Sequence, residues 1–432
     1  MSFYQEHAQN LPIIYETDIL VIGGGPAGVA AAVGAARQGE KTFLLERYGF
    51  LGGQATAGMS GAICGLFTSG KDKPIKQLVN GFAGEFYQLL KDRKAITEPF
   101  PFGDTALSIH DPLVWKEVAD NLLIEAGVKI LFHTLVTDVV IEKDHLVGVL
   151  IENKDGRSVI KAKRFIDATG DADICVKAGI PFTMGDNGKI QYPTMVFRMN
   201  QVDIPKALSH PVPQLEAWVD HANQAGYYLP RRHIYLLPSP RPNEVLCNVT
   251  AVLREEALPL DPTKTEDLTY AELKGRKIIR EYERFLQNYV SGFEQARIND
   301  CATQIGIRQS RTIVGMGKLM NDDVLNARKS DRSVAKSAWC IEAHGSDGIF
   351  MFYFDDDYYD IPYDTLVPIK IDNLITAGRT ICAEHEALAS ARVTAQCFLT
   401  GYAAGVASHL SLKNQTNYAD VNVQTLRSII EY

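Results

Sequence analysis

The stretch Thr17-Asp-Ile-Leu-Val-Ile-Gly-Gly-Gly-Pro-Ala-Gly28 runs from a short apolar segment into three spaced glycines. This order is typical of a strand, a tight turn and a helix that together bind a dinucleotide. Gly23 permits the turn, Gly25 lets backbone amides approach a pyrophosphate, and Gly28 lets the helix lie close to the strand. Glu46 follows the next apolar run and suits a ribose with free hydroxyls. The sequence therefore predicts a dinucleotide site near its start.

Composition limits the kind of partner that the rest of the chain binds. The 432 residues are 46% hydrophobic and 22% charged, which is ordinary for a folded protein of two or three domains. The net charge is -8, and no Lys/Arg-rich stripe is present, so we expect no nucleic-acid partner. We expect a small-molecule substrate. The sequence leaves the oligomeric state open and is compatible with a homo-oligomer.

Hydropathy and cysteine usage point to a cytoplasmic protein. No run of about 18 apolar residues is present, so we expect no membrane span. Residues 1–16 contain no Lys or Arg, which is unlike a signal peptide. The seven cysteines are odd in number and include no C-x-x-C pair, which favours reduced thiols and excludes a redox-active disulfide of that type.

Further strand and helix patterns organise the rest of the chain around the opening unit. Residues 49–70 read as a small-residue loop that lies against a ligand, and Asp111 caps a helix that reaches Ala126. Two more apolar strands end in glycine turns, at Gly170 and Gly378. The other expected elements are helices at 81–92, 266–290 and 392–410 and strands at 136–141 and 146–151. We predict an α/β fold in which residues 15–184 and 363–432 form the nucleotide domain and residues 185–362 form an inserted α+β substrate domain.

Four motifs together resemble one flavoprotein family. They are Val21 to Gly28 with Glu46-Arg47 and Leu51-Gly-Gly53; Asp167-Ala-Thr-Gly-Asp171; Gly306-Ile-Arg-Gln-Ser-Arg311 with Gly315; and Asn373 to Gly405. The chain resembles bacterial FAD-dependent oxidoreductases related to the fumarate reductase and succinate dehydrogenase flavoproteins. The resemblance implies a Rossmann-like FAD-binding domain of the glutathione-reductase-like type and a non-covalent FAD. One departure is Gln309, where the family pattern leads us to expect Glu, and it leaves the partner of Arg308 or Arg311 open.

The resemblance also implies which residues contact each part of FAD. For the pyrophosphate these are Gly23, Gly25, Pro26, Ala27 and Gly28; for the adenosine ribose Glu46 and Arg47; for the ribityl and phosphate side Gly53, Gln54 and Thr56; for the adenine the backbone of Val136. Ala168, Thr169 and Gly170 close the pocket, Gly378 and Arg379 contact the ribityl or pyrophosphate, and Arg392 and Val393 start a helix against the flavin pyrimidine edge. A helix N-terminus there stabilises negative charge on reduced flavin, although the small residues that follow also suit helix packing alone.

Three residues are candidates for the chemistry itself. His385, between two glutamates, is the first choice for a proton-handling group at the flavin, because imidazole titrates near working pH; the alternative is a loop-fixing role. His344, in Glu342-Ala-His344, is predicted in the substrate pocket, with a surface loop as its alternative. Arg311 clamps a substrate carboxylate together with Arg308, or both form structural salt bridges.

The remaining signals shape the functional hypothesis. The run from Phe350 to Tyr359 offers aromatic side chains for a pocket wall, and its three aspartates favour a solvated loop, so we expect no metal. We expect hydride transfer between a small organic substrate and flavin N5, with an electron acceptor that the sequence does not identify. A flavin-dependent monooxygenase and a non-catalytic flavin-binding protein are the alternatives.

Overall fold

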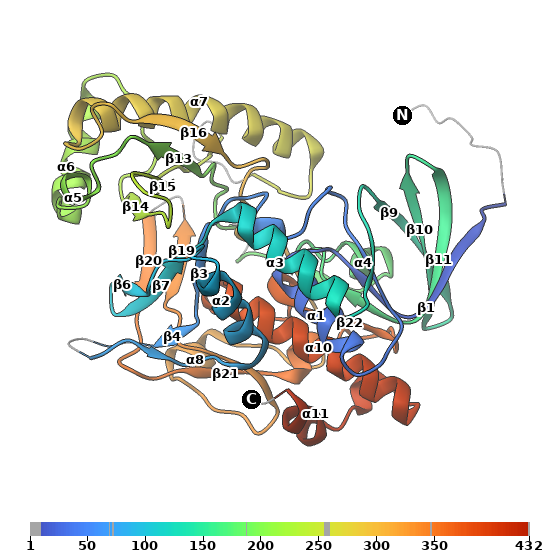
Figure 1. Ribbon diagram of the computed structural model, residues 1–432. Helices are drawn as coiled ribbons and strands as arrows, with labels where there is room; N and C mark the ends of the chain where they lie inside the picture. Colours follow the sequence, from blue (N-terminus) through green and yellow to red (C-terminus); the bar gives the residue numbers. More distant parts are fainter. Residues whose placement is uncertain are drawn as a thin grey trace.

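The computed structural model describes residues 10–68, 70, 73–186, 188–254, 260–345 and 348–430. Its centre is a seven-stranded sheet in the order β8-β2-β1-β11-β10-β9, with β22 paired to the end of β11 (Figure 1). Strands β8 (Lys129–Leu131), β2 (Thr42–Leu45), β1 (Ile13–Ile22), β11 (Gly156–Asp167) and β22 (Leu374–Thr376) are parallel. The prediction that residues 1–16 are not a signal peptide concerns residues 1–9 in part, and these lie outside the described ranges.

The opening unit folds as the glycine spacing predicts. Strand β1 is followed by α1 (Pro26–Ala36) and then by β2. Gly23 has a φ of +102°, and a side chain on Gly28 would meet the carbonyl oxygen of Gly23 at 1.8 Å, so helix and strand are in direct backbone contact. The carboxyl ends of β1, β2, β11 and β22 therefore meet at one edge, where Gly23, Glu46, Gly170 and Gly378 all lie.

Other predicted elements of this half are also confirmed. Strands β9 (Leu135–Glu142) and β10 (His145–Asn153) extend the sheet in antiparallel fashion. Helix α3 (Pro112–Glu125) begins after Asp111, whose carboxylate accepts the backbone N–H of Leu113 at 2.8 Å. The shorter elements are η1 (Gly53–Ala55), β3 (Ala62–Cys64), β4 (Phe67–Thr68), β5 (Lys76–Gln77), α2 (Gly81–Asp92), β6 (Phe100–Phe102), β7 (Thr105–Ile109) and α4 (Asp173–Lys177).

Helix α10 (Thr394–Asn414) packs along α1 beside the sheet (Figure 1). Side chains on Gly401 and Gly405 would lie 2.1 Å from the carbonyl oxygens of Ala27 and Ala31. These two glycines therefore allow α10 to pack closely on α1, which is the alternative that the sequence analysis gave for the small residues of this helix. After β22 the chain forms η4 (Gly378–Thr380), α9 (His385–Ala391), α10, η5 (Tyr418–Asp420) and α11 (Val423–Ile429).

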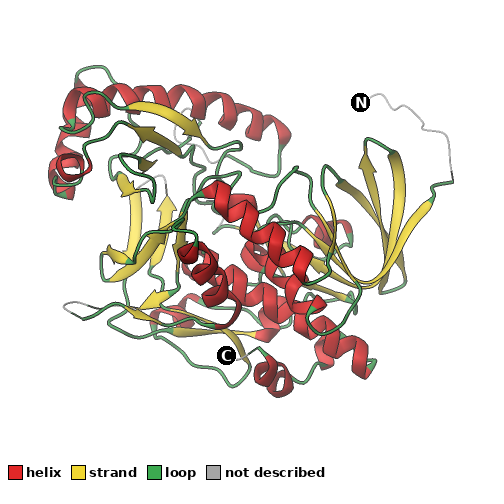
Figure 2. Ribbon diagram, in the orientation of Figure 1, coloured by secondary structure: helices red, strands yellow, loops and turns green. Residues whose placement is uncertain are grey.

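A second layer of structure lies between residues 182 and 366 (Figure 2). Its four-stranded sheet has the order β14-β15-β13-β16, and the long helix α7 (Thr265–Tyr289) packs with it around one apolar core. The strands are β13 (Phe197–Asn200), β14 (Tyr235–Pro238), β15 (Val245–Asn248) and β16 (Arg297–Cys301), and the short helices are α5 (Ile204–Ala207) and α6 (Val212–Gln224). This is the predicted α+β character.

The last part of that region shares a core with the nucleotide half. Leu319, Val334 and Ile361 are buried in the same cluster as α1 and α10. Its elements are α8 (Asn321–Leu325), β18 (Ser333–Ser337), β19 (Ile341–Gly345), β20 (Gly348–Phe352), β21 (Tyr359–Pro362) and η3 (Tyr363–Leu366), while β12 (Phe182–Met184) pairs with β17 (Arg311–Ile313). The boundaries at 184/185 and 362/363 stay predictions. No described helix has the length and apolarity that a membrane crossing requires.

Candidate active site

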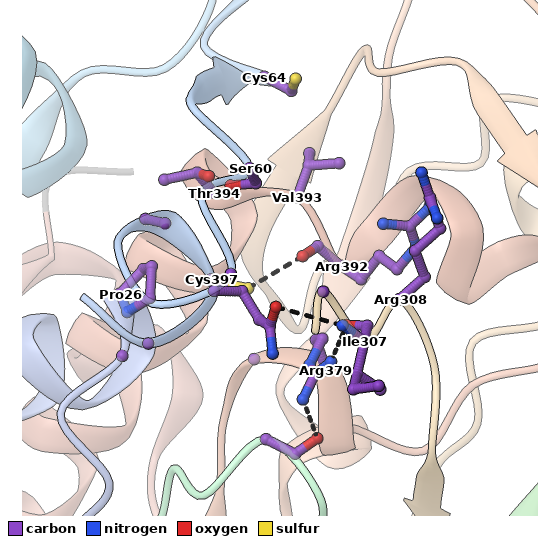
Figure 3. A pocket seen from close by; sticks show the side chains of 18 of the residues that line it. Pro26, Ser60, Cys64, Ile307, Arg308, Arg379, Arg392, Val393, Thr394 and Cys397 are labelled. Atoms are coloured by element: carbon purple, nitrogen blue, oxygen red, sulfur yellow. Dashed lines mark hydrogen bonds between the residues drawn. The ribbon is translucent and has the colours of Figure 1, made fainter. Parts of the chain in front are cut away.

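One large cavity joins the two halves of the molecule. Its empty space is about 1480 Å³, part of it open to solvent, and it runs from the glycine turn after β1 to residues of β14, β15 and β19. Figure 3 shows part of its lining, with Pro26 of α1 on one side and Arg308 on the other. Its glycine end is lined by Gly23, Gly25, Gly53, Gly170 and Gly378. Its far end is lined by aromatic and charged side chains of the inserted region. The cavity therefore joins a glycine-lined end to an end lined by large side chains.

Two helices begin at the cavity with no side-chain cap. Gly25 caps α1 and Val393 caps α10, and neither N-terminus receives a hydrogen bond from its capping side chain. Both capping residues line the cavity. A side chain on Gly25 would have no neighbour nearer than 4.0 Å, so this glycine faces open space. The cavity therefore offers free backbone amides and two positive dipole ends to an anionic ligand.

Glu46 is built into the glycine turn. Its Oε2 accepts the backbone N–H of Gly24 at 2.6 Å, and its Oε1 accepts that of Tyr48 at 2.9 Å. Burial raises the pKa of the Glu46 carboxyl, and these two backbone donors oppose the rise. The side chain therefore orders the turn as well as lining the cavity.

Arg379 ties three segments together at the centre of the cavity. Its guanidinium donates to the Gly170 carbonyl at 2.8 Å, to Asp171 at 3.2 Å and to the Ile307 carbonyl (Figure 3). Asp171 also accepts the hydroxyl of Ser310 at 2.6 Å. The second and third glycine-ended strands are thereby joined to the loop after β16.

That loop, residues 302–310, closes over the glycine end through further hydrogen bonds. Gln304 accepts a hydrogen bond from Arg47 at 3.0 Å, and the backbone N–H of Ile307 donates to Gln54 at 3.2 Å. Arg47 and Gln54 were both expected at the cofactor. The inserted region therefore completes the site that the nucleotide half begins.

The far end of the cavity has aromatic walls and a buried polar group. Phe102 stacks on Trp339 with ring centroids 5.5 Å apart and meets Tyr235 edge-on at 4.9 Å. Beside them, His344 is 1% exposed, with Nε2 2.9 Å from Glu342 and Nδ1 3.2 Å from the Tyr192 hydroxyl. The far end therefore combines aromatic surface with a buried, hydrogen-bonded imidazole.

Charge and burial set the protonation of the His344–Glu342 pair. Burial and the nearby Arg308 hold the pKa of His344 well below its usual value, so the ring is neutral. Burial opposes ionisation of Glu342, yet the hydrogen bond from His344 and the cations Arg392 and Arg308 keep its pKa at about 2. The Glu342 carboxylate therefore accepts a hydrogen bond from Nε2–H of the neutral His344 ring, which leaves Nδ1 as an acceptor.

The family model described as FAD dependent oxidoreductase matches residues 18–430. The chain belongs to this family. It is an enzyme, and its cofactor is FAD. Three features of the cavity are those expected of an FAD site. They are the glycine-ended strands, the acidic residue after β2 and the two uncapped helices.

Thiamine thiazole synthases are similar to only part of this chain. Thiamine thiazole synthase from Methanococcus vannielii is 34% identical over 170 residues, which cover 37% of this chain and 59% of that protein. The Methanococcus maripaludis C7 protein of the same name is 32% identical over 165 residues, covering 36% and 57%. The chain therefore spans a little under three fifths of these relatives.

Among solved structures, p-nitrophenol 4-monooxygenase from Pseudomonas putida DLL-E4 matches with a TM-score of 0.51 and 12% identity. The match covers 97% of this chain and 87% of that one. At this identity the likeness concerns the fold alone. It supports the Rossmann-like, FAD-binding α/β fold that the sequence predicts.

The residues present fit FAD at the glycine end. The open space at Gly25 and the free amides of α1 suit the pyrophosphate, and Glu46 stands at the end of β2 where the adenosine ribose is expected. The uncapped start of α10 suits the pyrimidine edge of the flavin. When bound, FAD supplies the redox chemistry, and the protein supplies position, charge and protons.

Most predicted cofactor residues line this cavity. They are Gly23, Gly25, Pro26, Ala27, Glu46, Arg47, Gly53, Gln54, Ala168, Thr169, Gly170, Gly378, Arg379, Arg392 and Val393. Three others lie outside its lining. Gly28 is covered by the Gly23 carbonyl, Thr56 donates its hydroxyl to the Leu51 carbonyl at 2.7 Å, and Val136 packs in the core on the sheet. The contacts of these three residues with FAD stay predictions.

The catalytic candidates separate clearly. His344 lines the cavity, whereas His385 and Arg311 do not. His385 begins α9, where burial lowers its pKa and its Nδ1 has no hydrogen-bond partner among the described residues. Arg311 forms an ion pair with Asp173 and donates to the Asp171 carbonyl at 2.6 Å. Its position matches the structural salt bridge that was the alternative to a substrate clamp.

The aromatic run after Phe350 does not form a wall of the cavity. Phe354 and Tyr359 are buried in the nucleotide-half core, and Phe350 is exposed. The three aspartates pair with Lys73, Lys76 and Lys329 at the surface. The described residues contain no group of His, Cys, Asp and Glu arranged to hold a metal ion, and the predicted solvated loop agrees with these pairs.

Several cavity residues carried no sequence signal. Tyr235, Asn248, Gln304 and Trp339 come from segments with neither a motif nor a periodic pattern. Glu342 was noticed only as the acidic neighbour of His344. The prediction of a loop at 49–70 was wrong in part, because η1, β3 and β4 form within it where Ala62–Cys64 and Phe67–Thr68 pair with other strands. Its small residues Gly58, Ser60, Ala62 and Cys64 nevertheless line the cavity.

Proposed function

We propose that this enzyme transfers a hydride between a small organic substrate and flavin N5, with His344 handling the accompanying proton. The observation that carries the proposal is the buried His344–Glu342 pair in the same cavity as the FAD-binding glycines. When bound, FAD would serve as the hydride acceptor in the oxidative direction; the substrate would then give up a hydride from carbon and a proton from an acidic group, and His344 would accept that proton.

His344 is arranged to accept that proton. Its neutral ring donates Nε2–H to Glu342, which leaves Nδ1 free to exchange the 3.2 Å bond from Tyr192 for a bond from the substrate. The carboxylate then stabilises the imidazolium, as an acidic partner does for a catalytic histidine. Phe102, Tyr235 and Trp339 shield this exchange from water.

The test compares the two histidines that the sequence offered. In an anaerobic screen, the purified holoenzyme is mixed with candidate metabolites, and loss of flavin absorbance identifies substrates. His344→Gln should retain FAD and slow bleaching by at least about 100-fold, the usual effect of losing an acid/base group. The matched variant His385→Gln should change the rate by less than about threefold, because that ring lies outside the cavity.

Unchanged bleaching in His344→Gln would remove this residue from the mechanism. If bleaching is slow in His385→Gln and normal in His344→Gln, then His385 is the proton-handling residue, as the sequence first suggested. Retained flavin absorbance and unchanged thermal unfolding show that each variant is folded, so a rate difference reports chemistry.

Two wider points of the interpretation remain proposals of the same kind. All seven cysteines are free, which supports a cytoplasmic site of action for the enzyme and its small-molecule substrate. The four motifs quoted above support a relation to the fumarate reductase and succinate dehydrogenase flavoproteins. Sequence comparison with those flavoproteins, aligned on the loop from Gly306 to Arg311, tests that relation.

A further inference from the structure

Three arginines lie in or behind the far wall of the cavity and have no carboxylate partner among the described residues: Arg308 and Arg392 line the cavity, and Arg231 reaches it through Asn248. Arg308 and Arg231 are 7% and 3% exposed, and Arg392 lines the cavity beside them. Arg308 donates to the Tyr192 carbonyl at 2.9 Å and to Asn248 at 3.2 Å. Arg392 donates to Gln191 at 2.9 Å and to a backbone carbonyl. All of these acceptors are neutral.

Arg231 shares one of those neutral acceptors. Its Nη1 donates to the same Asn248 oxygen at 3.0 Å, and its Nη2 has no partner among the described residues. A single amide oxygen therefore holds two guanidinium groups side by side. Buried cations are ordinarily paired with an anion, because burial without one is costly.

The nearby negative charge does not balance these cations. Glu342 is the one carboxylate among the cavity's far-end lining residues, and it is hydrogen-bonded to His344. Arg379 is already paired with Asp171. Burial and the neighbouring Arg231 lower the pKa of Arg308 to about 9, the direction expected of a cation that lacks an anion.

FAD does not supply the missing charge at Arg308. Its pyrophosphate belongs at the glycine turn and the start of α1, whereas the acceptors of Arg308 come from the inserted region. In the view of Figure 3, Pro26 of α1 lies on one side of the cavity and Arg308 on the other, with Arg392 between them. Arg392, at the start of α10, is the cation placed for the flavin edge.

Resting on the proposed function, we infer that the substrate is an organic carboxylate, whose anionic group is bound by Arg308 with Arg231 and Asn248 behind it. The aromatic group of Phe102, Tyr235 and Trp339 then contacts an apolar body. The anionic partner of Arg308 is thus a ligand and not the side chain at position 309. Gln309 accepts a backbone N–H from Gln191 at 3.3 Å and adds no charge.

The test measures ligand binding without turnover. The FAD-loaded enzyme is titrated with acetate, hexanoate and benzoate, and separately with the three corresponding amides, while the visible flavin spectrum is recorded. At least one carboxylate should bind about tenfold or more tightly than its amide, since a charge-assisted bidentate pair is lost in the amide. Arg308→Met should abolish this preference, and Arg308→Lys should retain part of it.

Arg232→Gln is the matched control, because Arg232 is the exposed neighbour of Arg231 and pairs with Glu216 and Asp220 at the surface. It should leave the carboxylate preference unchanged. Equal binding of every acid and its amide by the unmodified enzyme overturns the inference and requires no variant. A preference that survives in folded, FAD-loaded Arg308→Met overturns it as well. Neither result depends on bleaching rates, so the hydride-transfer proposal stands or falls separately.

Discussion

The two ends of the cavity are built from opposite kinds of residue. At the glycine end, Gly23, Gly25 and Gly378 present backbone: Gly23 packs on the main chain of Ala168, and Gly378 donates its N–H to the Thr400 hydroxyl at 3.1 Å. At the far end, Arg308, His344 and Trp339 present large side chains held by hydrogen bonds across the inserted region. The first end suits the FAD pyrophosphate through exposed backbone, and under the inference above the second would bind a carboxylate through charge and aromatic surface.

This difference explains how one fold serves many substrates. The backbone end tolerates almost no change, because each missing side chain makes room for another atom of the protein or the cofactor. The side-chain end changes its chemistry by substitution at positions that leave the sheet and helices intact. The two ends should therefore respond differently to mutation.

The largest expected effect separates two glycines only three residues apart. In Gly28→Ala the new methyl group would lie 1.8 Å from the Gly23 carbonyl oxygen, so strand and helix must separate. We expect destabilisation above about 3 kcal/mol and little folded protein. In Gly25→Ala the methyl group enters open cavity, so the apoprotein should lose about 1 kcal/mol or less while FAD affinity falls by at least about tenfold.

Thermal unfolding of apoprotein and fluorescence titration with FAD check both variants. A Gly28→Ala protein as stable as the original would show that the helix has room to shift. A Gly25→Ala protein that binds FAD normally would show that the pyrophosphate lies elsewhere.

The glycine end was predictable from sequence because backbone geometry leaves a local trace. The turn at Gly23 needs a φ of +102°, and a Cβ on Gly28 would meet the Gly23 carbonyl oxygen, so both of these reasons for glycine lie within six positions; the close approach of Ala168 to Gly23 is the part that only the fold supplies. Local reasons also apply to the cap at Asp111 and to the strand ending at Asp167. Thr56 and Val136 were assigned to the cofactor by resemblance alone, and they lie outside the cavity lining.

The far end left no such trace. Arg231, Asn248 and Arg308 are distant in the chain, and only the inserted fold brings their side chains together. His385 looked more catalytic than His344 because it has acidic neighbours on both sides. In the structure those glutamates bind the N-terminal turn of α8: Glu384 accepts the backbone N–H of Asn321 at 2.8 Å, and Glu386 accepts its side-chain amide.

A smaller effect is expected where the two ends are joined. Arg379→Lys removes the planar fork that bonds Gly170, Asp171 and Ile307, and a lysine replaces only part of these bonds. We expect a loss of about 1.5 to 3 kcal/mol and a FAD affinity reduced by about tenfold. Arg332→Lys is the control, since it removes a similar two-bond fork to Asp364 and neither residue lines the cavity. It should lower the unfolding temperature and leave FAD affinity unchanged.

The smallest expected effect concerns pH, and it connects the charge of the far end to its chemistry. Burial and Arg308 lower the pKa of His344 well below its usual value, so the ring stays an unprotonated base throughout pH 6 to 8. The bleaching rate at saturating substrate should therefore vary by less than about twofold over this range, whereas an unperturbed histidine would lose activity as pH falls through about 6.5. Arg308→Met removes one of the two causes, so the pKa of His344 should rise and the rate should begin to fall at a higher pH. His385→Gln should keep the flat pH profile of the original enzyme.

A different outcome is a bleaching rate that already declines near pH 6.5 in the original enzyme. The proton acceptor would then be a more exposed group than His344. The assignment of the chemistry to the side-chain end of the cavity would in that case be wrong.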